Sequence, residues 1–290
     1  QQKKDSVAKW AAAEELCCQL FSEPGAGSDL ANVSTKAERD GDEWILNGQK
    51  VWSSGAQFSP WGMAVCRTDN ELAKHKGITV FIVPMDAPGL EVRQIQQMSG
   101  GTSFNEVFFT DVRVPDAYRV GDIGEGWKVA LTVLGFERGS SNGSSRIGGN
   151  WAQAKGLAQH LGVTSDPVVR DDLARLYSQY RIMALNSQRV AAQTKAGQAP
   201  GAEGSISKMI WVKSMNLMSD VVTKLLGPRI TADTGEWGTY GWNEHLLGAP
   251  GYRIAGGSDE IQRNIVGERV LGLPGEPRVD KNVPFKDIPK

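Results

Sequence analysis

A carboxylate followed by a guanidinium, in the stretch LGFERG, is the first pattern in the sequence that could do chemistry. Glu137 follows Ala130 at i+7 and Leu134 at i+3, so the helical period places it on an apolar, inward-facing stripe, with Arg138 beside it. Carboxylates on buried faces are frequent at functional sites, because burial changes how readily they take up a proton. The stretch fits either a structural Glu–Arg pair or a general base.

An aromatic plane beside two hydroxyls forms the second pattern, Trp52-Ser53-Ser54, just after a predicted hairpin turn. When this stretch is taken alone, a tryptophan in the core of a sheet is the simpler interpretation. A binding role needs support from other parts of the chain.

Three glycine-containing stretches complete the candidates. FSEPGAGSDL holds Gly25 and Gly27, but a dinucleotide fingerprint needs a third glycine at position 30 and a βαβ unit, so a surface turn is as good an interpretation as a ligand loop. GSSNG, residues 139–143, matches the spelling of a nucleophile elbow but follows a helical stretch, which disfavours a hydrolase. AGGSDEIQRN places Gly256 and Gly257 before a helix, where glycine indicates φ > 0 or a close neighbour.

The elements that must position these residues change type along the chain. From about residue 16 to residue 115 short alternating or β-branched runs dominate, and Asp40-Gly41 and Asn47-Gly48 both fit two-residue hairpin turns. No βαβ alternation is present. The pattern predicts an antiparallel, β-barrel-like domain over residues 16–118.

The second half of the chain has a helical period. It begins after Gly126, and further helices are expected from Asp166-Pro167, after Gly204 and near Asp259, with a long loop over residues 229–251. Helices joined by loops indicate a bundle, here residues 119–290. The expected fold class is therefore α+β, a β-domain followed by a helical bundle.

Composition excludes several classes of partner. Lys and Arg number 32 against 33 Asp and Glu, which gives a net charge of −1. This balance predicts that the protein binds neither nucleic acid nor a partner with an acidic surface. Cys17 and Cys18 are adjacent and Cys66 makes the count odd, which predicts a reducing, cytoplasmic setting. Without CxxC spacing or clustered histidines no metal is expected, and without a long apolar run no membrane span is expected.

Three stretches in order, LFSEPGAGSDLA, NGQKVWSSG and EIQRNIVGERVLGLP, resemble the acyl-CoA dehydrogenase family over about Leu16 to Pro274. Members of this family oxidise acyl-CoA thioesters with FAD, commonly as dimers or tetramers. They join an N-terminal helical domain, a middle β-domain and a C-terminal helical bundle. This chain resembles the latter two, and residues 1–15 resemble the end of the first, so the N-terminal helical domain is expected to be missing from this sequence.

The resemblance implies an FAD site. Trp52 would lie against the isoalloxazine ring, and the Ser54 hydroxyl would hydrogen-bond near N5, because it can donate or accept in either redox state. The expected FAD contacts are Gln19, Phe21, Ser22, Ser28, Trp52, Ser53 and Ser54, with Ser258 and Glu260 reaching the FAD of a neighbouring subunit. The expected substrate contacts are Ser28, Arg138 and Gly257.

The base of the reaction is expected in an alternative place. Many members carry Tyr-Glu-Gly-Thr before the last helix, and that Glu removes the α-proton; here Gly256 stands in its position. Other members place the base on a helix directly before an Arg, as Glu137 stands before Arg138. The resemblance therefore implies that Glu137 takes the α-proton while the β-hydride passes to flavin, giving a 2-enoyl-CoA. Electrons would go on to an electron-transferring flavoprotein.

Two departures from the family pattern concern the FAD tail. The usual Arg-x-x-Phe-Gly element is not found, with Arg170 at best a substitute, and Lys224 replaces the usual Gln before the Leu-Gly turn. With the AGG spelling, this resembles actinobacterial members, some of which form mixed α2β2 assemblies for sterol side-chain degradation. An acyl-CoA substrate and a second copy or a paralogous subunit are the expected partners. A catalytically silent structural subunit and an oxidase-like enzyme using O₂ stay open as alternatives.

Overall fold

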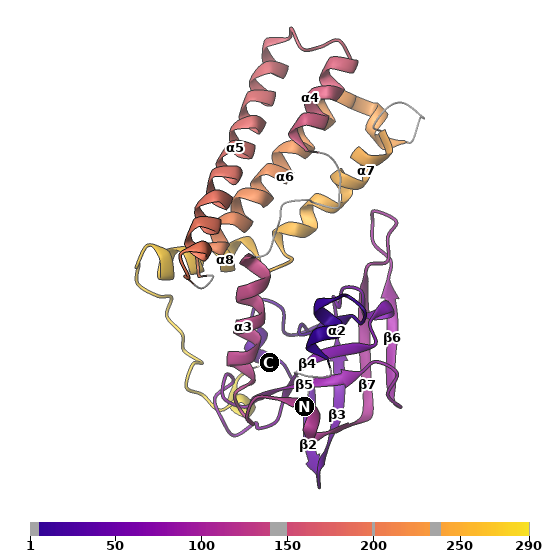
Figure 1. Ribbon diagram of the computed structural model, residues 1–290, viewed down its shortest axis with the longest axis vertical. Helices are drawn as coiled ribbons and strands as arrows, with labels where there is room; N and C mark the ends of the chain where they lie inside the picture. The colour runs from indigo at the N-terminus through magenta and orange to yellow at the C-terminus, as the bar shows by residue number, and fades with distance from the viewer. Residues whose placement is uncertain (1–5, 140–149, 199–200, 233–238, 290) are drawn as a thin grey trace. The chain divides into compact units, whose positions relative to one another are not determined.

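The computed structural model describes residues 6–139, 150–198, 201–232 and 239–289, which form two compact units (Figure 1). The sheet unit holds Gln1–Val133 together with Pro277–Lys290, and the helical unit holds Leu134–Glu276. An eight-stranded sheet followed by helices confirms the predicted α+β class.

The sheet is mainly antiparallel, but β1 and β2 each pair with β4 in parallel. Its order is β6-β7-β3-β2-β4-β5-β8, with β1 beside β4. The strands are β1 (Cys17–Leu20), β2 (Lys36–Asp40), β3 (Glu43–Lys50), β4 (Trp61–Arg67), β5 (Ile78–Pro84), β6 (Leu90–Ile95), β7 (Phe104–Pro115) and β8 (Arg119–Val120). Predicted site residues lie in β1 and in the segments that follow β1 and β3, so the sheet fixes where these segments begin.

The first predicted hairpin forms, with Gly41 and Asp42 rather than Asp40 and Gly41 as its two turn residues, and it leads into the core of the sheet unit. Asp40 pairs with Glu43 across the turn, and Gly41 has φ +65°. Inward residues of β3 follow the period of two, and the ring of Trp44 packs 5.2 Å from that of Phe81. This hairpin therefore sets the register of β3 on the buried core.

The prediction of a second hairpin turn at Asn47-Gly48 is wrong. Both residues lie inside β3, where the register with β7 shifts between Leu46 and Gly48. A Cβ on Gly48 would meet Thr35 Oγ1 at 2.6 Å. The glycine therefore permits a bulge pressed against a neighbouring segment, a role that local spelling does not distinguish from a turn.

The C-terminal tail belongs to the sheet unit, whereas the sequence pattern grouped it with the helices. Within Pro277–Lys290, Phe285 is buried, and its ring lies 3.9 Å from the guanidinium carbon of Arg67. Asp280 pairs with the ammonium of Lys74. An aromatic anchor and ion pairs, of which Lys286 with Glu71 is another, thus hold a stretch with no helical period.

Helices make up the helical unit, and α3 begins in the sheet unit. The α-helices are α2 (Val7–Ala11), α3 (Gly126–Gly139), α4 (Trp151–His160), α5 (Pro167–Lys195), α6 (Gly204–Leu226), α7 (Thr239–Gly248) and α8 (Asp259–Ile265). α5 begins as predicted, with Asp166 accepting from the Val168 and Val169 amides and Pro167 at the first helical position. Within the residues that the structure describes, no helix is long and apolar enough to span a membrane.

Part of the predicted loop over residues 229–251 is helical instead. α7 buries Trp242 and His245, and His245 Nε2 lies 3.0 Å from the Met215 carbonyl of α6. Trp242 joins a core shared by α4, α5 and α6, and Figure 1 shows α5 and α6 running side by side. The glycine-rich composition of this stretch gives no local signal of a helix. The helix is stabilised by its packing on α6, which the local sequence does not show.

Candidate functional site

The first predicted flavin segment, residues 19–28, continues from β1. Gln19 is exposed between two buried neighbours, Phe21 is buried, and Ser22 is half-buried. Ser28, at the end of the segment, is exposed. The alternation along β1 therefore turns the predicted cofactor side chains toward both the core and the surface.

A tight turn lies within this segment. Glu23 and Ala26 exchange backbone hydrogen bonds of 3.1 and 3.0 Å, which closes the turn. A Cβ added at Gly25 or Gly27 would meet nothing within 4 Å. The stretch FSEPGAGSDL is therefore a surface turn with open space beside its glycines, where a ligand can approach the backbone.

The second predicted flavin segment, residues 51–54, follows β3 and is joined to the first. The Val51 amide donates to the Ser22 carbonyl at 2.9 Å. Trp52 has φ +61°, its side chain is 59% exposed, and its ring meets that of Phe104 edge-on at 6.0 Å. The interpretation of Trp52 as a core residue is therefore wrong. A bulky residue at positive φ is an outlier of the kind that clusters at functional sites.

The two serines beside Trp52 differ in burial. Ser53 is 1% exposed; its amide donates to the Asn105 carbonyl at 3.0 Å, and Asn105 Nδ2 donates back at 2.8 Å. The Ser53 hydroxyl oxygen is buried without a hydrogen-bond partner among the described residues. Ser54 is exposed. The backbone here is fixed, with one orphaned hydroxyl and one accessible hydroxyl.

These features fit a flat heterocyclic cofactor such as a flavin. An exposed indole on a fixed, strained backbone offers a face for stacking, and the neighbouring hydroxyls offer donors and acceptors. The open glycine turn lies on the adjoining segment. The structure thus brings together the Phe21-Ser22 and Trp52-Ser53-Ser54 stretches, through the hydrogen bond between Val51 and Ser22.

The sequence analysis missed a buried ion pair between these segments. Lys50 is fully buried, and its ammonium lies 2.7 Å from Glu23 Oε1. Burial alone would raise the pKa of Glu23, but the charge of Lys50 and hydrogen bonds from Lys50, Thr35 and Ser34 hold that pKa below its usual value. Period two gave a signal, because Lys50 falls on the same inward face of β3 as Trp44.

In the helical unit, the two predicted glycines form a built turn. Gly256 has φ +65° and Gly257 has φ +86°, which confirms the expected positive φ. Gln262 Nε2 donates to the Gly256 carbonyl at 2.7 Å, and Lys208 Nζ donates to the Gly257 carbonyl at 2.8 Å. A Cβ on Gly257 would meet Gln262 Nε2 at 2.5 Å. The close neighbour of this backbone is thus a side chain of the same unit.

The residues after this turn begin α8. Ser258 Oγ accepts from the Ile261 amide at 3.3 Å, so the serine caps the helix. Glu260 is exposed and lies 3.8 Å from Arg263. Asp259 is buried. Burial alone would raise the pKa of its carboxyl, but hydrogen bonds from Arg253 and Lys208 outweigh that effect and hold the pKa below its usual value. The cofactor role predicted for Ser258 and Glu260 stays a prediction.

The inward placement predicted for Glu137 is not found. Ala130 is buried where α3 begins on the sheet unit, with Gly126 close against β5. Farther along, Leu131 and Phe136 are exposed, and so is Glu137. The apolar stripe is therefore covered only near the start of the helix in the single chain. The side chain of Arg138 and the elbow-like stretch from residue 140 on lie outside the described residues.

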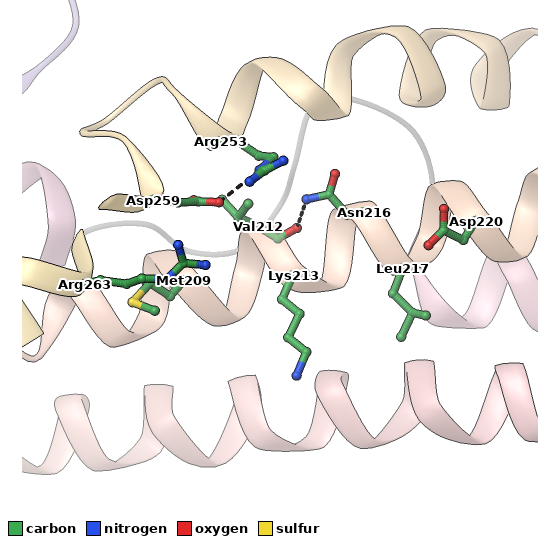
Figure 2. Close-up of a pocket in the computed structure, with 9 residues that line it drawn as sticks. All are labelled: Met209, Val212, Lys213, Asn216, Leu217, Asp220, Arg253, Asp259 and Arg263. Atoms are coloured by element: carbon green, nitrogen blue, oxygen red, sulfur yellow. Dashed lines mark hydrogen bonds and ion pairs between the residues drawn. The ribbon is translucent and has the colours of Figure 1, made fainter. Parts of the chain in front are cut away.

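One pocket of the helical unit lies between α6 and α8, with a volume of about 450 Å³ (Figure 2). Figure 2 shows Arg253 paired with Asp259 at 3.0 Å on one side. Its lining residues are Met209, Val212, Lys213, Asn216, Leu217, Asp220, Arg253, Asp259 and Arg263. Cations and carboxylates are mixed in this wall, which gives no single charge preference for a ligand.

Known proteins align with nearly the whole chain. The family "Acyl-CoA dehydrogenase, middle domain" matches residues 18–112, and "Acyl-CoA dehydrogenase, C-terminal domain" matches residues 124–271. Acyl-CoA dehydrogenase IpdE1 of Mycobacterium tuberculosis is 40% identical over 280 residues, which cover 95% of this chain and 71% of that protein. The human mitochondrial short-chain specific acyl-CoA dehydrogenase is 28% identical, covering 93% of this chain and 66% of that protein.

Two solved structures also resemble this chain over nearly its whole length. A structure titled Tcur3481-Tcur3483 steroid ACAD has a TM-score of 0.83 and 30% identity, covering 95% of this chain and 72% of that one. The ChsE4-ChsE5 complex from Mycobacterium tuberculosis has a TM-score of 0.79 and 28% identity, with 95% and 73% covered.

Proposed function

The chain belongs to the acyl-CoA dehydrogenase family of flavin-dependent oxidoreductases, and we propose that it binds FAD and oxidises an acyl-CoA thioester to the 2-enoyl-CoA. The observation that carries this proposal is Trp52, an exposed indole on a strained backbone beside an orphaned buried hydroxyl. A positive φ at a bulky residue costs energy, and such residues cluster at functional sites.

The residues of the sheet unit would hold the flavin, which supplies the electron acceptor of the reaction. Trp52 would cover one face of the ring, and the accessible Ser54 hydroxyl would orient its edge by a hydrogen bond. Gln19, Phe21, Ser22 and Ser28 line the adjoining segment.

We assign the α-proton to Glu137 as general base. The α-proton of a thioester is weakly acidic, so its removal needs a nearby, partly desolvated carboxylate. Glu137 is exposed in the single chain, so its desolvation would come from the bound substrate or from another subunit. Gly257 stays a proposed thioester contact, although Gln262 Nε2 occupies the place where its Cβ would lie, and Arg138 follows the base in sequence.

An assembly with a second copy or a paralogous subunit is part of this proposal. The ChsE4-ChsE5 complex and the Tcur3481-Tcur3483 steroid ACAD, which resemble this chain, are each named after two components. Ser258 and Glu260 would reach the FAD of the neighbour, and an electron-transferring flavoprotein would accept the electrons. Light scattering of the FAD-loaded protein should show at least a dimer.

A catalytically silent subunit is the second candidate. The observations that favour it are Gly256 in place of a carboxylate and the exposure of Glu137. An enzyme that is oxidase-like instead would differ in its acceptor, because it would make peroxide under air.

One experiment separates these candidates. The purified yellow protein is mixed without oxygen or other acceptor with a set of acyl-CoA thioesters, including a steroid-side-chain thioester. Bleaching of the flavin absorption supports the dehydrogenase, and a stable yellow colour with every thioester supports the silent subunit. Peroxide release in air would identify the oxidase. If the purified protein is colourless and does not bind added FAD, the proposed FAD site itself is wrong.

A further inference from the structure

The buried ion pair of the sheet unit has a geometry that a packing role alone does not need. Lys50 ends β3, and its ammonium makes three hydrogen bonds. They go to the Phe21 carbonyl at 3.1 Å, to Glu23 Oε1 at 2.7 Å and to the Val65 carbonyl at 2.6 Å. An ammonium has three protons, so its full donor capacity is used. Three parts of the unit are tied to one atom.

Glu23 is held just as completely. Its Oε1 also accepts from the Thr35 amide at 2.9 Å, and its Oε2 accepts from the Ser34 amide at 2.7 Å and the Ser34 hydroxyl at 2.9 Å. Two buried charges cost desolvation energy that only such complete hydrogen bonding offsets, and an apolar pair often stabilises a core equally well. An ion pair at this position therefore calls for a reason beyond stability.

The position of the pair supplies that reason. Lys50 stands two residues before Trp52, and Glu23 directly follows Ser22. Between them, the Val51 amide donates to the Ser22 carbonyl at 2.9 Å. Any displacement of the Lys50 ammonium would move both predicted flavin segments.

The strained backbone of Trp52 depends on its two flanks. On one side Val51 is tied to Ser22, and on the other Ser53 is tied to Asn105. A bulky residue stays at φ +61° only where its surroundings fix it. The ion pair fixes the first flank, because the same ammonium holds the Phe21 carbonyl.

Arg67, another buried cation of the sheet unit, offers a contrast. Arg67 donates to the carbonyls of Ala31, Val33 and Lys74, which lie outside the two flavin segments. It ties surrounding loops together, whereas Lys50 ties the segments that carry Phe21 and Trp52.

We propose that Lys50 and Glu23 are positioning residues for the flavin ring, holding the two proposed flavin segments at the spacing that presents the Trp52 ring and the Ser54 hydroxyl. This inference rests on the proposed FAD function. The pair itself touches no reacting atom; it acts through the backbone that it fixes.

The test uses the purified protein in its native assembly and the double variant Lys50→Met with Glu23→Leu, which removes both charges at similar volume. Val114→Ala, a cavity in the same core far from both segments in sequence, is the control for lost stability alone. We expect the double variant to fold, as judged by far-UV circular dichroism. We expect its Kd for FAD to rise roughly tenfold or more, the scale seen when outer supports of a site are removed. The visible circular dichroism of bound FAD should weaken, while Val114→Ala should keep the parent's FAD affinity and spectrum.

The outcomes are distinguishable. Parent-like FAD affinity and spectrum in a folded double variant would overturn the positioning role. If that variant does not fold, Glu23→Gln keeps the shape and removes one charge; it should show a smaller loss in the same two readouts, and parent-like values there would also overturn the role. The proposed function fails separately, if the parent does not bind FAD or if Trp52→Ala binds it as tightly as the parent.

Discussion

The sheet unit and the helical unit hold their proposed functional residues in opposite ways. Trp52 presents an exposed ring, but its backbone is fixed on both flanks by hydrogen bonds within the unit. Glu137 is exposed near the end of α3. Of the 29 residues of α5, all of which the structure describes, Asp172 and Leu176 are buried.

The difference suggests how the proposed functional residues of each unit are held. The flavin segments of the sheet unit are organised by contacts inside that unit, including the buried pair of Lys50 and Glu23. The long helix of the helical unit leaves large apolar side chains exposed: Val168, Tyr177, Tyr180, Ile182 and Leu185. These side chains are spread along the helix and do not by themselves define a binding patch. We therefore expect the proposed cofactor segments to be preorganised, and the proposed base Glu137, which is exposed, to need the substrate or a neighbouring surface for its desolvation.

The largest effect is expected at Glu137. Glu137→Gln should keep FAD and acyl-CoA binding but lose turnover by about 10²-fold or more, because the base is removed at nearly constant shape. Single-turnover bleaching of the flavin measures it. Glu125→Gln, an exposed carboxylate just before the same helix, is the matched control and should turn over like the parent.

A parent-like rate in Glu137→Gln would place the base elsewhere, and Glu260 would be the next carboxylate to test. Adding Gly256→Glu to the Glu137→Gln variant asks whether the usual family position can serve. A side chain at Gly256 meets nothing within 4 Å, but its φ of +65° is costly for any residue with a Cβ. Partial rescue at most is expected.

The second effect tests whether the C-terminal tail is part of the sheet unit. Phe285→Ala should lower the free energy of unfolding by about 3 kcal/mol, the usual cost of truncating a buried Phe. It also removes the ring from Arg67, whose pKa burial lowers to about 10, so this cation depends on its contacts. Thermal unfolding measures the loss. Val279→Ala, 94% exposed in the same tail, should change little; equal shifts for the two variants would mean that the tail contributes no packing.

Local rules predicted the parts of the fold that local rules decide. The cap at Asp166 with Pro167 marked the start of α5, because capping and the fixed φ of proline act within one turn. The two glycines of the AGG stretch predicted positive φ for the same reason, since only backbone sterics are involved. The motifs of the family predicted where the flavin segments lie, and this stays a prediction; which of their side chains are exposed came only from the structure.

Contacts distant in sequence decided the rest. Asn47-Gly48 has the spelling of a turn, but the approach of Thr35 makes it a bulge. Lys50 and Glu23 lie 27 residues apart, and their pairing depends on how the segment that follows β1 is placed beside the end of β3. The helical period correctly placed Ala130 inward but could not say where along α3 its cover ends, which is why Glu137 is exposed. The helical period shows which way a side chain points, but its burial depends on which residues pack against that face of the helix.

The smallest effect is expected in the helical unit, at the turn formed by Gly256 and Gly257. Side-chain hydrogen bonds hold this turn, as hydrogen bonds hold the proposed flavin segments of the sheet unit. Gly257→Ala and Gly256→Ala both place a Cβ at positive φ, which costs roughly 1–2 kcal/mol each. Only the Cβ at Gly257 would also press on Gln262 Nε2, at 2.5 Å, so Gly257→Ala should lower the melting temperature by more. Because Gln262 donates to the Gly256 carbonyl, its displacement would also loosen the turn that Lys208 holds from the other side. Paired thermal unfolding curves measure the difference. Equal melting temperatures would mean that the Gln262 side chain moves aside freely and that its contact does not fix this turn.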